Sequence, residues 1–107
     1  MKRVGIMLKV KNEKMDEYRE VHKTVWPEMK EALSRQGWHN YSLFLTEDGF
    51  LFGYFETPVD FQTALKGMET EPINEKWQKA MAPFFEALSG KRADESMVVL
   101  EEVFHTE

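Results

Sequence analysis

The order of strand-like and helix-like segments constrains this chain more than any other feature of its sequence. Strands are indicated by alternating apolar residues, and helices by apolar residues that recur along one stripe. The predicted strands are residues 3–10, 38–45, 50–56 and 97–104, and the predicted helices are about 16–36, 60–67 and 73–88. This β-α-β-β-α-β order, with extra helical material in the second crossover, predicts an α+β fold. Its antiparallel sheet is expected to be ferredoxin-like, with the helices on one side.

Turn and cap residues set the boundaries of these segments. Pro27 removes a backbone donor from the first helix and predicts a kink or a fresh start near Trp26. Gly37 follows the same helix at a position suited to a left-handed cap. The other boundary signals are an Asp-Gly hairpin pair at 48–49, a helix-capping Asp60, a bend or division at Pro83 and a polar loop at 89–95.

Both faces of the predicted sheet carry apolar residues. Phe50, Phe52 and Tyr54 alternate with Leu51 and Phe55, and Met97, Val99 and Val103 alternate with Val98, Leu100 and Phe104. A sheet with one wet face would alternate apolar and polar residues, and two helices cover only one face. The other face therefore predicts a homodimer packed sheet to sheet. The alternative is a single exposed apolar patch that serves a different partner.

Composition limits the partners and the compartment. The 107 residues fit one domain, 1–107, and the 42% hydrophobic fraction suits a globular protein. Fourteen basic and 19 acidic residues give a net charge of −5 without a basic cluster, so nucleic acid is not an expected partner. No segment resembles a membrane span or a signal peptide. The chain has no cysteine, which excludes disulfides and thiolate metal sites and suits an expected cytoplasmic location.

The first helix contains the densest group of polar and aromatic side chains. Tyr18, His22 and Trp26 are spaced by four residues and share a sector of about 80° if the helix is continuous. A histidine among core residues is usually a hydrogen-bonded structural group. The functional alternative is that His22 lines a cleft and exchanges protons near neutral pH.

Two further groups could contact a ligand. In the stretch WHNY, Trp38 and Asn40 are predicted on one face of a strand and His39 and Tyr41 on the other, where Tyr41 either packs in the sheet or offers its hydroxyl to a ligand. Trp77 either belongs to the core or provides a flat surface for a sugar ring. The three histidines lack metal-ligand spacing, and neither a phosphate-binding glycine loop nor a nucleophile elbow occurs. We therefore expect no metal.

The stretches EYREVHKTVWPEMKEAL and GWHNYSLFL resemble the L-rhamnose mutarotase family, whose members have an EY…RH…WPE signature followed by an HNY-like strand. The similarity continues through Trp77 and Met81 to the terminal EEVF at 101–104, and so spans nearly the whole chain. It implies a dimeric α+β barrel that needs no cofactor and interconverts the α and β anomers of L-rhamnose.

The resemblance also implies roles for single residues. His22 would be the catalytic proton donor, and Tyr18, Tyr41 and Trp77 would contact the sugar. Well-known members have a second tryptophan where this chain has Gln78, and a glutamine there can still hydrogen-bond a sugar hydroxyl. The substitution leaves open whether the sugar is L-rhamnose or a related 6-deoxy sugar. The loop at 89–95 also lacks the Asn-Pro-Asp-Asn-type sequence of the family.

Mutarotation opens the pyranose to an aldehyde and closes it on the other face, which requires an acid, a base and a shielded pocket. His22 as imidazolium would protonate the ring oxygen, and the base could be a tyrosine, a water molecule or His39. The rival functions are a cofactor-independent monooxygenase or haem-degrading protein of similar fold, and a non-catalytic sugar-binding module.

Overall fold

The structure is a computed structural model that describes residues 1–86 and 97–107. The strands are β1 Lys2–Lys9, β2 His39–Leu45, β3 Phe50–Thr57 and β4 Val98–Leu100, and the helices are α1 Met15–Val21, α2 Pro27–Arg35, α3 Phe61–Glu69 and α4 Pro72–Met81. Single 3-10 turns occur at Asn12–Lys14, His22–Thr24 and Ala82–Phe84. The predicted β-α-β-β-α-β order is confirmed, and α3 is the extra helix of the second crossover.

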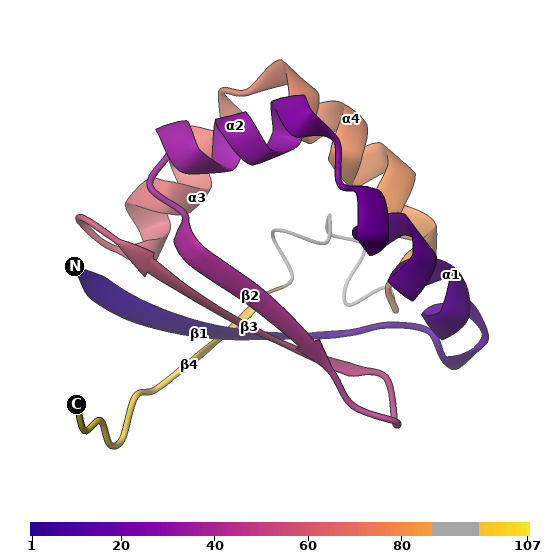
Figure 1. The fold of residues 1–107 in the computed structure, drawn as a ribbon, viewed down its shortest axis with the longest axis horizontal. Helices are drawn as coiled ribbons and strands as arrows, with labels where there is room; N and C mark the ends of the chain where they lie inside the picture. Colours follow the sequence, from indigo (N-terminus) through magenta and orange to yellow (C-terminus); the bar gives the residue numbers. More distant parts are fainter. Residues whose placement is uncertain (87–96) are drawn as a thin grey trace.

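The four strands form one antiparallel sheet in the order β2-β3-β1-β4. All four helices arch over the same face of this sheet (Figure 1). In the described part of the chain, none of them is long and apolar enough to cross a membrane. The core lies between sheet and helices, where Ile6, Leu51 and Phe55 are at most 2% exposed. Gly53 leaves room for this packing, because a Cβ there would come within 2.8 Å of the Ile6 side chain.

The predicted helix at 16–36 is two helices with an extended link between them. Val25 and Trp26 have ψ values of 136° and 133°, and α2 begins at Pro27. The proline ring disfavours a helical residue before it but suits the first helical position, so the helix restarts there. The fresh start near Trp26 is thereby confirmed, as is the cap at Gly37, which has φ +83°.

The last predicted helix is also divided. α4 ends at Met81, and a 3-10 turn that contains Pro83 leads to Phe85, which bridges to Val10. The predicted continuation to Leu88 and the loop at 89–95 lie outside the described residues.

The prediction of a fourth strand over 97–104 was wrong in its extent. β4 pairs with β1 only from Val98 to Leu100, at the edge of the sheet. Beyond it the Arg3 guanidinium binds the Glu102 carboxylate at 2.8 and 3.0 Å, so a side-chain contact stands where backbone pairing would continue. Residues 101–107 are exposed.

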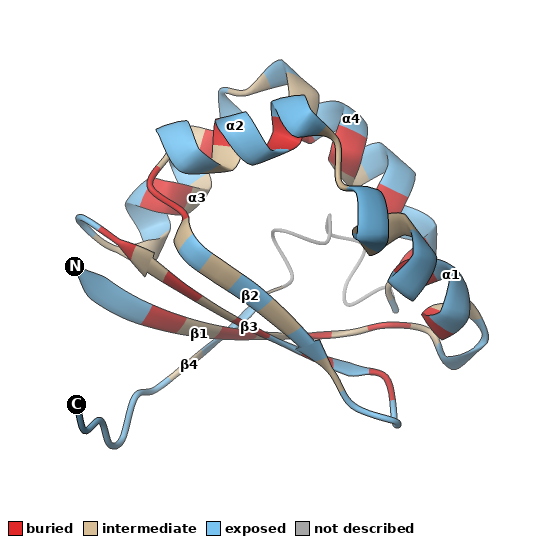
Figure 2. Cartoon of the chain, viewed as in Figure 1, coloured by how far each residue is buried: buried red, intermediate tan, exposed pale blue. Residues whose placement is uncertain are grey.

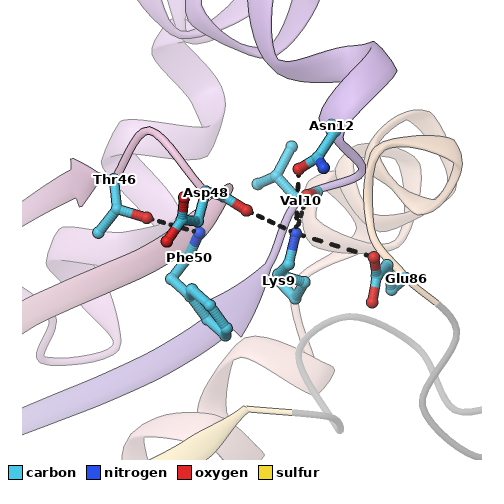
Figure 3. A network of polar contacts seen from close by, with 7 residues as sticks. All are labelled: Lys9, Val10, Asn12, Thr46, Asp48, Phe50 and Glu86. Atoms are coloured by element: carbon cyan, nitrogen blue, oxygen red, sulfur yellow. Dashed lines mark hydrogen bonds and ion pairs between the residues drawn. The ribbon is translucent and has the colours of Figure 1, made fainter.

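A lysine joins three segments at the far end of β1 (Figure 3). Nζ of Lys9 donates to the Asp48 carbonyl at 2.7 Å and to Oδ1 of Asn12 at 3.2 Å, and lies 3.8 Å from the Glu86 carboxylate. The adjacent Gly49 has φ +90°, and a Cβ there would lie 2.6 Å from the Val10 carbonyl oxygen. The predicted Asp-Gly turn therefore packs directly against the end of β1.

The face of the sheet away from the helices is apolar and exposed. Phe44, Phe52 and Val98 are 59%, 38% and 52% exposed, and Val103 in the terminal segment is 86% exposed. Leu51 and Phe55, which alternate with the exposed phenylalanines of β3, are buried. Figure 2 shows buried segments of β3 on the sheet that the helices cover. The prediction that both faces of the sheet carry apolar side chains is confirmed.

Candidate active site

A cavity of about 610 Å³ is lined by residues from β1, β2, β3 and all four helices. All five residues predicted from the sequence to form the site line it: Tyr18, His22, Tyr41, Trp77 and Gln78. Its wall also contains polar residues that the sequence did not single out for a ligand, including Lys30, Ser34, Asn40 and Asn74. A cavity of this volume is in the range of small-molecule sites.

The end of α1 sets the position and the tautomer of His22. α1 stops at Val21, and the backbone N–H of its C-cap residue, His22, donates to the Tyr18 carbonyl. Nδ1 of His22 lies 2.9 Å from the Tyr18 carbonyl oxygen, and the two side-chain rings stack with centroids 4.1 Å apart. A carbonyl oxygen only accepts, so Nδ1 bears the hydrogen and the neutral ring has its lone pair on Nε2.

Burial shifts the pKa values of three side chains that line the cavity, His22, Tyr18 and Tyr41. It lowers the pKa of His22, an effect that the hydrogen bond to the Tyr18 carbonyl partly offsets. It raises the pKa of both Tyr18 and Tyr41, and the Tyr41 phenol adds to the increase at Tyr18. At neutral pH the His22 imidazole is therefore neutral, and the Tyr18 and Tyr41 phenols are protonated.

Trp77 packs between His22, at the end of α1, and Trp26, just before α2. The Trp77 ring meets His22 edge-on at 5.5 Å and Trp26 edge-on at 5.0 Å. The row of Tyr18, His22 and Trp26 was predicted only for a continuous helix, and it does not extend to Trp26 because the helix ends at Val21. Trp26 instead supports Trp77 and does not line the cavity.

A bulge in β2 turns Tyr41 toward the helices. Asn40 has φ +49°, and the register of β2 against β3 shifts between His39 and Ser42. Trp38 and Tyr41 therefore lie together, with ring centroids 5.3 Å apart, instead of on the opposite faces predicted by simple alternation. Nδ2 of Asn40 donates to Oε1 of Glu56 at 2.9 Å, which holds the bulge to β3.

An amide pair on α4 completes the polar part of the wall. Nε2 of Gln78 donates to Oδ1 of Asn74 at 3.2 Å. Asn74 is 2% exposed, and the sequence analysis missed it. Its spacing of four residues from Gln78 on one helix face was the available signal.

The residues that the structure describes contain no cluster of three or more His, Cys, Asp or Glu that could hold a metal ion. The cavity brings together two imidazoles, two phenols and two indoles, from His22 and His39, Tyr18 and Tyr41, and Trp38 and Trp77. These groups can exchange protons with a small polar ligand and donate hydrogen bonds to it.

Residues 3–106 match a family model described as L-rhamnose mutarotase. The chain belongs to the L-rhamnose mutarotase family. The resemblance seen in the first-helix and WHNY stretches is thereby confirmed.

Relatives and a solved structure agree with this membership. The L-rhamnose mutarotase of Oceanobacillus iheyensis is 41% identical over 108 residues, which is 98% of each chain. That of Bacillus subtilis is 38% identical over 90 residues, or 83% of this chain and 85% of the relative. The crystal structure of the L-rhamnose mutarotase from Formosa agariphila covers 100% of both chains with a TM-score of 0.79 and 29% identity.

The fold extends beyond the mutarotase family. A protein proposed to be an antibiotic biosynthesis monooxygenase, from Nitrosomonas europaea, matches 97% of this chain and 100% of its own with a TM-score of 0.58. It is only 15% identical, so the likeness shows a shared α+β fold and nothing about the reaction.

Proposed function

We propose that this protein interconverts the α and β anomers of L-rhamnose in the cavity, with His22 as the catalytic residue. The observation that carries the proposal is the state of His22. Its Nδ1 hydrogen is held by the Tyr18 carbonyl, while Nε2 has no hydrogen-bond partner within residues 1–86 and 97–107. A neutral imidazole with an available lone pair is suited to accept a proton near neutral pH.

Ring opening then begins with His22 as a base. Nε2 takes the proton of the anomeric hydroxyl, the bond between C1 and the ring oxygen breaks, and a C1=O1 double bond forms. Negative charge develops on the ring oxygen, and an O–H from Tyr18 or Tyr41 stabilises it by donating a hydrogen bond. After rotation about the C1–C2 bond the steps reverse on the other face of the aldehyde. His22 now returns its proton to O1, whereas the sequence analysis expected its imidazolium to protonate the ring oxygen at the start.

The remaining site residues are proposed to hold the sugar. Trp77 offers an indole face to the C–H surface of the ring, and Gln78 offers its amide to a hydroxyl. The test is the optical rotation of freshly dissolved α-L-rhamnose. The protein should shorten the time in which the optical rotation reaches its equilibrium value, without changing that value. An unchanged time course would contradict the proposal.

The dependence of the rate on pH follows from the lowered pKa of His22. The enzyme-dependent rate should persist below the ordinary histidine pKa of about 6.5 and be lost as the pH falls through the lowered value, because protonation removes the accepting lone pair. Exchange rates between about pH 4.5 and 8.5, corrected for the rate without protein, measure this profile. A rate that rises as the pH falls would show instead that the imidazolium initiates the reaction. Circular dichroism at each pH controls for unfolding.

We also propose that the protein is a homodimer whose subunits pack sheet against sheet. The support is the apolar face that the helices leave uncovered, with Phe44, Phe50 and Phe52 at least 38% exposed. A contiguous apolar surface of this kind marks an interaction site. Residues Val103 and Phe104 extend the same character into the exposed terminal segment.

Light scattering at micromolar concentration should therefore give twice the chain mass of 12.6 kDa. Phe52→Lys should shift the population to monomer, because it places a charge in the centre of the proposed contact. Gln62→Lys, on an exposed position of α3, is the matched control and should remain dimeric. A stable wild-type monomer would refute the proposed contact.

A further inference from the structure

One polar atom in the wall of the cavity has no hydrogen-bond partner among the described residues. This atom is Oε1 of Gln78, which is also buried. Gln78 lines the cavity beside Trp77, its neighbour on α4, whose ring touches His22. Leaving a buried acceptor unpaired costs free energy, so such an atom requires an explanation. One explanation is a bound molecule that donates a hydrogen bond to this oxygen.

Asn74 determines which end of the Gln78 amide stays unpaired. Its Oδ1 accepts from Nε2 of Gln78 at 3.2 Å, across one turn of α4. Because Asn74 is 2% exposed and lies within the helix, it is a fixed anchor. An amide has its donors on nitrogen and its acceptor on oxygen, so anchoring Nε2 leaves the carbonyl oxygen for a ligand. A ligand at this part of the wall is therefore expected to donate a hydrogen bond to Gln78 rather than accept one from it.

We propose, on the basis of the mutarotase function above, that Gln78 is a specificity-determining residue whose Oε1 accepts a hydrogen bond from one ring hydroxyl of the sugar. Asn74 is a positioning residue that holds the Gln78 amide in the orientation to do so. The site then selects sugars with a free hydroxyl at the carbon that faces Gln78. A site built to pair a hydroxyl discriminates strongly against an analogue that lacks it, because its own polar group is then left unpaired.

Sugars altered at single positions test this assignment. The probes are 2-deoxy-, 3-deoxy- and 4-deoxy-L-rhamnose and the three matching deoxyfluoro sugars, with kcat/KM for anomer exchange as the measurement. One deoxy sugar should react at least about tenfold less efficiently than L-rhamnose. Its fluoro counterpart should be equally poor, because a C–F group cannot donate a hydrogen bond. A fluoro sugar that restores the efficiency would overturn the assignment of Gln78 as an acceptor.

The Gln78→Met variant tests whether Gln78 is the residue that recognises the missing hydroxyl. Methionine has a similar length but no strong acceptor, so the variant should lose about tenfold on L-rhamnose and lose nothing more on the affected deoxy sugar. Gln62→Met, the same change on the exposed face of α3, should behave as wild type. An equal loss on all sugars, or no loss at all, would overturn the proposal.

Two variants of Asn74 test the positioning role. Asn74→Asp keeps an oxygen that accepts from Nε2 of Gln78 and should keep the discrimination against the deoxy sugar. Asn74→Leu frees the amide and should reduce that discrimination, whereas a purely structural role would change only the melting temperature. If Asn74→Leu does not fold, Gln78→Met still decides the matter. If the wild-type protein is inactive on L-rhamnose, the proposed mutarotase function is overturned.

If it is active but Gln78→Met affects L-rhamnose and the deoxy sugars equally, only the role of Gln78 in specificity is overturned.

Discussion

His22→Asn is expected to lower the enzyme-dependent exchange rate between the anomers of L-rhamnose by about two orders of magnitude or more. The asparagine amide fills similar space and can still donate to the Tyr18 carbonyl, which His22 contacts at 2.9 Å. It cannot accept and return a proton near neutral pH, so the chemistry is lost while the fold is kept. NMR exchange rates and thermal melts on the same samples separate these two effects.

Val21→Ala is the matched control for the His22 variant. Val21 precedes His22, packs against the hydrophobic core and does not line the cavity. Its truncation should cost on the order of 1 to 3 kcal/mol of stability and leave the rate per folded molecule unchanged. A His22→Asn protein that melts early but keeps its rate per folded molecule would make His22 a structural histidine.

Trp77→Leu is expected to reduce stability and rate together. Trp77 is 7% exposed, and its ring holds His22 edge-on at 5.5 Å. The smaller side chain leaves a cavity that costs about 2 kcal/mol, and it frees the imidazole to move, which should lower the rate about tenfold or more. Saturating L-rhamnose should change the tryptophan fluorescence of the wild type, and most of this change should be absent from the variant.

Phe55→Leu is the matched control for Trp77→Leu. Phe55 is fully buried, stacks on Trp38 with ring centroids 4.0 Å apart and does not line the cavity. The Phe55→Leu variant should lose a similar amount of stability, and its rate of anomer exchange per folded molecule should be normal. If Trp77→Leu behaves in the same way, Trp77 belongs to the core alone and the sugar platform is refuted.

The fold was predictable because local signals agree with the tertiary structure. Each boundary depends on residues that are close together in the sequence. Examples are the alternation of β1, the caps at Gly37 and Asp60 and the helix start at Pro27. The short β4 was not predictable, because its extent depends on pairing with β1 and on the contact between Arg3 and Glu102, 99 residues apart in sequence. Apolar alternation indicates the capacity to form a strand and not the presence of a partner strand.

The site was predicted as a set of residues but not as an arrangement. Helical periodicity correctly joined Tyr18 and His22, which lie on one continuous turn. It would have included Trp26 only if the helix had continued past the predicted break. The left-handed Asn40 could not be recognised from WHNY, because most asparagines have negative φ even though asparagine is several-fold enriched at positive φ. The lowered pKa of His22 depends on burial by distant segments, so the sequence suggested an imidazolium where the structure favours the neutral ring.

Saturation transfer between the anomeric protons of L-rhamnose at equilibrium tests the central claim most directly. Irradiating the α anomeric proton should decrease the β signal, and do so much more strongly when a catalytic amount of the protein is present. The measurement follows the proposed reaction itself at neutral pH. The account predicts transfer that increases in proportion to protein concentration. Transfer equal to that in protein-free buffer, with folded protein confirmed in the same tube, would contradict it.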